Sequence, residues 1–202
     1  MKLNKTLEIK VKNISLSYLR KGRPNFDVPH TLCAVFWMKK ILKKENADEK
    51  CLLTAVYFHD VGYSCMFNKT ADYEQVIKNK KTHMKRGSAI AKKELSRLKE
   101  YSNKEIVKIS KFICNHDKLK EIKNREETLL MEADSLGMVD VIRIKPTFGA
   151  ENWTKFYEDF KRLRVPLFKT KISKKFLTIL LKKADRYYEK QMKLIKGPDK
   201  MA

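Results

Sequence analysis

The helical spacing of apolar residues constrains the fold of this 202-residue chain more than any other feature. A first stripe, with members three or four positions apart, consists of Leu7, Val11, Ile14 and Tyr18, and similar stripes follow through most of the chain. Six Gly and five Pro are too few for the many turns of a sandwich or barrel. We therefore predict an all-α protein with an ordinary core, because 43% of its residues are hydrophobic.

Capping residues and helix breakers divide the chain into predicted elements. We expect helices at about 4–20, 27–44, 46–58, 82–98, 102–116, 125–144, 152–163 and 173–195. Asn46 and Glu49, and Ser102 and Glu105, have the spacing of capping boxes. The polar stretch 62–81 is predicted to be a loop, long enough for a lid or a substrate loop.

The chain carries a formal net charge of +22, and most of its basic residues are lysines. One interpretation is a field that attracts nucleotides or nucleic acid, and the other is a solvated lysine-rich surface. The four cysteines form no CxxC pair, and the three that lie inside apolar runs are expected to behave as small apolar residues. The N-terminus lacks the apolar core of a signal peptide, and no segment has the length of a membrane span. We therefore expect a cytoplasmic protein without a membrane partner.

Each of the four histidines, His30, His59, His83 and His116, stands at the end of a core-facing apolar stripe. Asp134 shares a helix face with apolar residues, and Asp60 directly follows His59. A lone histidine at such a position is usually a helix cap or a satisfied core residue. Four together with two inward carboxylates instead predict a transition-metal site inside a bundle, because a buried carboxylate needs a cation.

The order His30, His59-Asp60 and Asp134 resembles the H…HD…D signature of the HD superfamily of metal-dependent phosphohydrolases. The surrounding segments VPHTLCAVFWMKKIL, LLTAVYFHDVGY and EADSLGMVDVIRI also resemble this family. The segments THMKRGSAIAKKEL and KFICNHD are similar to subfamilies that add two histidines and hold a second metal. The resemblance implies an HD-domain helical bundle at 26–145, with an N-terminal helical extension at 1–25 and a C-terminal one at 146–202.

The resemblance also implies a ligand set. Its members are His30, His59, Asp60 and Asp134 for a first metal, and His83 and His116 for a second, with Asp60 as the bridge and catalytic residue. Asp140 is an alternative to Asp134, because it also shares a helix face with apolar residues. Asp117 is expected beside the site. Imidazole ligands suit Fe, Mn, Co, Ni or Zn, and Mg is possible at a second site.

The implied reaction is hydrolysis of a phosphoester or phosphoanhydride by metal-activated water, with a nucleotide or dinucleotide as the favoured anionic substrate. Arg86, Arg23 and Lys118 are the candidate substrate-binding residues. Val-Gly-Tyr-Ser follows His59-Asp60, so the acidic pair of alarmone hydrolases is missing. The His-His-Glu and GYP elements of cyclic dinucleotide phosphodiesterases are missing as well.

Two other functions remain open from the sequence. Some HD proteins with six ligands resemble this one and are di-iron oxygenases, which need redox-active iron and consume oxygen. The other is a basic nucleic-acid-binding protein with a structural metal centre, which predicts strongly salt-dependent binding.

Overall fold

The computed structural model describes residues 2–67, 72–147 and 150–196, and within them it is entirely helical, without a strand. The α-helices are α1 (Lys5–Leu19), α2 (Asp27–Leu42), α3 (Glu49–Phe58), α4 (Tyr73–Leu95), α5 (Asn103–Asn115), α6 (Arg125–Val139), α7 (Ala150–Leu163) and α8 (Lys171–Lys196). Two short 3-10 helices are η1 (Val61–Tyr63) and η2 (Val165–Leu167). The all-α prediction is confirmed.

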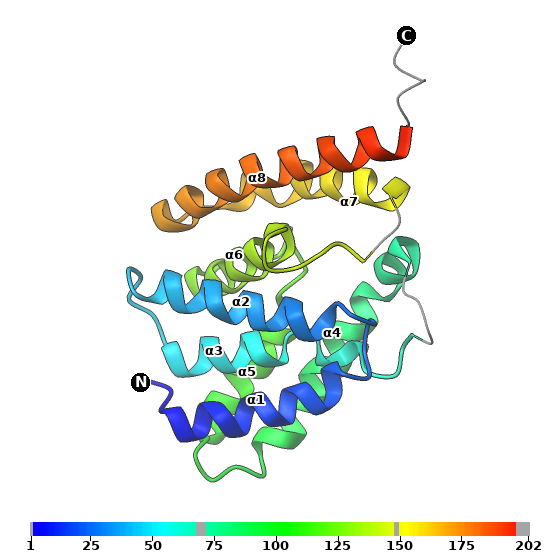
Figure 1. Ribbon diagram of the computed structural model, residues 1–202. Coiled ribbons are helices and arrows are strands. Elements are labelled where there is room, and N and C mark those ends of the chain that lie inside the picture. The colour runs from blue at the N-terminus through cyan, green and yellow to red at the C-terminus, as the bar shows by residue number, and fades with distance from the viewer. Residues whose placement is uncertain (1, 68–71, 148–149, 197–202) are drawn as a thin grey trace.

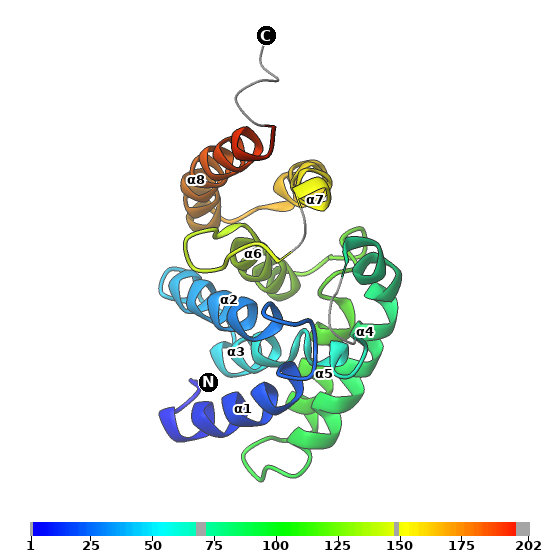
Figure 2. The ribbon, with the colours of Figure 1, turned by 45° about the vertical axis from the view of Figure 1, so that its right-hand side comes forward.

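The helices pack as a bundle in which α2 and α6 form one of the two most extensive contacts, near the centre, and α4 and α5 form the other (Figure 1). Helix α3 packs on α2 and α5, α5 packs on α4, and α1 covers α3. The pair α7 and α8 lies at one end of the bundle beyond α6, and α1 lies at the opposite end (Figure 2). No described helix is both long and apolar enough to cross a membrane.

Helix starts follow local capping chemistry, with two corrections to the predicted boundaries. The capping box of Ser102 and Glu105 is present at the start of α5. Asp48 rather than Asn46 caps α3, because its carboxylate accepts a hydrogen bond from the amide of Cys51. The prediction of a loop at 62–81 is wrong from residue 73 onward, where Asp72 caps α4. Residues 68–71 of that stretch lie outside the described chain.

Gly62 allows η1 to approach α4 backbone to backbone. A Cβ atom at this position would lie 1.8 Å from the carbonyl oxygen of His83, so no side chain fits. The contact brings the corner formed by His59 and Asp60 next to α4. The end of α3 and the middle of α4 therefore lie next to each other.

Candidate metal centre

Six buried side chains from five helices converge in the middle of the bundle. They are His30 on α2, His59 at the end of α3, Asp60 before η1, His83 on α4, His116 at the end of α5 and Asp134 on α6. None of them is more than 4% exposed. The structure thus brings together every predicted metal ligand.

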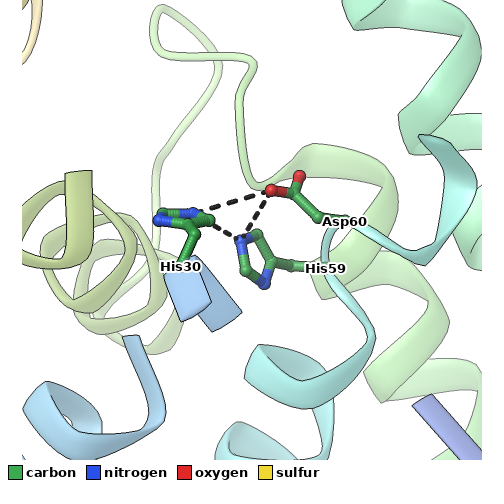
Figure 3. Close-up of side chains that lie close together, drawn as sticks. All are labelled: His30, His59 and Asp60. Atoms are coloured by element: carbon green, nitrogen blue, oxygen red, sulfur yellow. Dashed lines mark hydrogen bonds and ion pairs between the residues drawn. The ribbon is translucent and has the colours of Figure 1, made fainter. Parts of the chain in front are cut away.

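The first group surrounds His30 and His59, whose Nε2 atoms lie 3.1 Å apart. The Oδ1 atom of Asp134 is 3.0 Å from His30 Nε2 and 3.5 Å from His59 Nε2. The Oδ2 atom of Asp60 is 3.6 Å and 3.3 Å from the same two nitrogens. Figure 3 shows His30, His59 and Asp60 pointing toward one another. These distances fit donor atoms around a single ion.

The second group uses the other oxygen of Asp60. Its Oδ1 atom is 3.4 Å from His83 Nε2 and 3.7 Å from His116 Nε2, and these two nitrogens are 3.3 Å apart. One carboxylate therefore faces two histidine pairs, one with each oxygen. This is the arrangement of a carboxylate that bridges two neighbouring metal ions.

Hydrogen bonds at the rear of the rings show that these residues fit a metal. The Nδ1–H groups of His59 and His116 donate to the carbonyl oxygens of Val56 and Ile113, each at 2.7 Å. When such a ring is neutral, its Nε2 atom carries a lone pair and no proton, as a metal ligand requires. Lone pairs and carboxylate oxygens that converge in a buried space repel one another unless a cation lies between them.

Comparison with known proteins agrees with this geometry. A family model described as the HD domain matches residues 28–139, which is more than half of the chain. The chain belongs to the HD domain family. No curated protein and no solved structure matches it. The HD domain indicates the superfamily of metal-dependent phosphohydrolases, and all six converging side chains lie inside the matched residues.

Close packing of the six converging side chains shifts the pKa values of several of them. Burial lowers the pKa of His59, but Asp60 and Asp134 raise it more, so that the pKa lies well above its ordinary value. Burial raises the pKa of Asp60, but His59 and Arg23 lower it more, so that it lies well below its usual range. Burial and His116 lower the pKa of His83 to about 3. The first group therefore attracts positive charge, either as a proton on His59 or as a metal ion.

Arg23 holds Asp60 from one side. Its guanidinium donates to Asp60 Oδ2 and, at 2.5 Å, to Asp27 Oδ1. The same group lies 4.2 Å from the ring centre of Tyr63, which is stacked on His83. The predicted substrate-binding residue Arg23 is thus buried and bound to the HD aspartate itself.

Arg164 holds Asp134 from the other side, and the sequence analysis missed this residue. Its guanidinium donates to Asp134 Oδ2 at 2.9 Å, to Ser135 Oγ at 2.8 Å and to Asp117 Oδ1 at 2.5 Å. Lys80 pairs with the other oxygen of Asp117 at 3.0 Å. Arg164 lies beyond the HD match, between two helices, and nothing in its local sequence connects it to Asp134.

The other predicted residues have hydrogen-bond partners outside the group of six, and a substrate-binding role for Arg86 and Lys118 stays a prediction. Asp140 is buried but accepts hydrogen bonds from Trp37 at 3.0 Å and Arg143 at 2.7 Å, away from the histidines. Arg86 is half-buried and donates to the carbonyl oxygen of Ser64 at 2.9 Å. Lys118 donates to Asn115 Oδ1 at 3.1 Å. The structure therefore groups Asp134, and not Asp140, with the histidines.

Proposed function

We propose that this HD-domain protein is a hydrolase that cleaves a phosphate ester of a nucleotide or dinucleotide at a centre of two divalent metal ions. One observation carries the proposal: the two oxygens of Asp60 each face a separate pair of buried histidine nitrogens. His30, His59, Asp60 and Asp134 would hold the first ion, and Asp60, His83 and His116 the second. The imidazole ligands favour Fe, Mn, Co, Ni or Zn, with Mg as a further choice at the second site.

Bound divalent ions would supply a water nucleophile at neutral pH and Lewis-acid neutralisation of the phosphoryl oxygens. The chain's own residues fix the donor atoms for this purpose. Arg23 and Arg164 each bind one oxygen of a ligand carboxylate, Asp60 and Asp134 respectively. They thereby orient both carboxylates before any ion or substrate arrives, and such prior orientation avoids reorganisation during the reaction.

The charge of the chain supports an anionic substrate. A net charge of +22 raises the local concentration of phosphate compounds and speeds their approach. The same charge is compatible with a nucleic-acid partner, for which strongly salt-dependent binding is the signature. We take a small nucleotide as substrate, because the six ligand side chains are deeply buried and a folded polynucleotide would not reach them.

The test is metal analysis of the purified protein together with a phosphate-release screen over nucleotides and dinucleotides. Asp60→Asn should lose bound metal and at least about a hundredfold in turnover, because it removes the bridging charge. Asp140→Asn is the matched control, since Asp140 is also buried but its carboxylate binds Trp37 and Arg143. Retention of metal and turnover by a folded Asp60→Asn variant would contradict the proposal.

A second arm separates hydrolysis from oxygen chemistry on the same scaffold. Turnover should persist without oxygen and with redox-inert Zn or Mg, since hydrolysis moves no electrons. Oxygen consumption that depends on iron would instead identify an oxygenase.

A further inference from the structure

A cavity of about 610 Å³ lies beside the metal centre, between the first half of α4 and α7. Helix α7 is held against α4 across this space by a hydrogen bond of 2.8 Å from Tyr73 to Asp159 and by the pair of Lys155 and Glu74. Most of its wall is apolar, formed by aromatic and aliphatic residues that include Phe26, Tyr73, Ile77, Phe156, Phe160 and Leu163. Its volume and apolar lining are those of a small-molecule site.

Three lining residues at the inner end of the cavity contact the proposed metal ligands, none of which lines the cavity itself. Phe26 is stacked on His30, with ring centres 5.0 Å apart. Arg23 binds Asp60, and Arg164 binds Asp134. A molecule in the cavity therefore lies one side chain away from the proposed ligands of the first metal ion.

The outer end of the cavity exposes apolar side chains that its neighbours do not cover. Ile77 on α4 and Leu163 on α7 both line it, yet they are 43% and 42% exposed. Of the lysines that line the cavity, Lys80 pairs with Asp117 and Lys155 pairs with Glu74. Exposed apolar side chains at the edge of a cavity match a ligand with an apolar part.

We propose that this cavity binds the organic part of the phosphate substrate, and that this part carries a flat aromatic group such as a nucleobase. The inference rests on the proposed function, since it places the phosphate at the metal end. Four aromatic residues line the wall, Phe26, Tyr73, Phe156 and Phe160, and stacking on aromatic rings is the common way to bind a base.

Part of the cavity wall lies outside the family match. Leu163 and the other lining residues of α7 lie beyond residues 28–139, the part that matches the HD domain. The matched residues therefore include the proposed metal ligands and the start of α4, but not the α7 side of the cavity. Selectivity between substrates is set by α7 and the start of α4.

Three phosphonates that cannot be hydrolysed test the inference by calorimetry on the metal-loaded protein. They are methylphosphonate, benzylphosphonate and the phosphonate analogue of AMP. The two aromatic probes should bind at least about tenfold more tightly than methylphosphonate, as expected for one stacked ring. The double variant Ile77→Ser/Leu163→Ser should reduce this preference by about tenfold, with unchanged binding of methylphosphonate.

The matched control is Ile9→Ser/Ile179→Ser, which removes apolar side chains that are 51% and 46% exposed but do not line the cavity. Unchanged binding of the aromatic probes by Ile77→Ser/Leu163→Ser would overturn the cavity assignment even if the protein hydrolyses nucleotides. If no phosphate ester is hydrolysed but the aromatic preference and its loss are both measured, the cavity assignment stands and the proposed function fails.

Discussion

Replacement of Arg164 by methionine tests whether this arginine supports the metal centre. The guanidinium is buried and donates to two carboxylates and one hydroxyl at 2.5–2.9 Å. Removal of one partner from a buried ion pair costs about 3–5 kcal/mol. The cost arises at Asp134, which loses its only arginine contact among the described residues. We expect the lower end of the range, about 3 kcal/mol, because the second carboxylate, Asp117, keeps its pair with Lys80.

The same substitution should weaken metal binding. Without Arg164, Oδ2 of Asp134 is no longer fixed, and loss of such a supporting contact lowers metal affinity by about 10- to 100-fold. Urea unfolding of the chelated protein measures the free energy of unfolding, and competition with a chromogenic chelator measures the metal affinity. We expect a lower free energy of unfolding and, separately, a lower metal affinity, because the unfolding measurement is made on protein without metal.

Two variants make this result interpretable. Arg164→Lys keeps the charge, but one ammonium cannot span both carboxylates, so stability should partly recover while metal affinity stays low. Arg162→Met is the matched control, because Arg162 is exposed and, within the described part of the chain, pairs with Asp159 on its own helix. If Arg164→Met unfolds at the same urea concentration as the parent protein and binds metal equally well, our account of the buried carboxylates is refuted.

Three further predictions concern other parts of the fold. The folded-state pKa of His83 is about 3 against about 6.5 unfolded, so the contribution of His83 to the stability of the metal-free protein should fall by about 2 kcal/mol between pH 7.5 and 5. The lowered pKa of His30 acts in the same direction and the raised pKa of His59 in the opposite one, so the contribution is measured as the difference between urea titrations of the parent protein and of His83→Gln at each pH, and equal pH profiles for the two would contradict it. Gly62→Ala should cost at least about 3 kcal/mol, since its Cβ would lie 1.8 Å from a backbone oxygen, whereas Gly87→Ala, whose nearest neighbour is a side chain at 3.2 Å, should cost much less in the same unfolding assay. Glu132→Gln should weaken the hydrogen bonds of 2.6–3.0 Å to the segment before α8 by about 2 kcal/mol, which hydrogen exchange of those amides would detect, with metal content unchanged.

The fold class and the convergence of the ligands were predictable from the sequence because both depend on local periodicity. A polar residue on the apolar face of a helix must face the core when that helix packs. His30, His83 and Asp134 are buried in this way. The choice of Asp134 over Asp140 came from the family resemblance. The residues alone left it open, since both aspartates are buried in the structure.

The parts that could not be predicted depend on contacts between distant segments. The start of α4 was missed because residues 73–81 are mostly polar. Their few apolar members, such as Tyr73 and Val76, are buried in the structure but are too few to form a recognisable apolar stripe. Arg164 was missed because an arginine is usually exposed, and its partners lie 30 and 47 positions earlier. No periodic pattern relates such positions.

The two buried arginines show why the HD match alone does not make up the centre. Arg23 precedes residues 28–139 and Arg164 follows them, yet each binds a carboxylate that lies inside them. Without these flanking residues, Asp60 and Asp134 would be buried acids with no arginine beside them, an arrangement that costs several kcal/mol until metal is bound. The flanking segments also supply part of the cavity wall, with Phe26 before the matched segment and Leu163 after it. The matched segment therefore provides the six converging side chains, whereas the arginines that hold two of its carboxylates come from both sides of it.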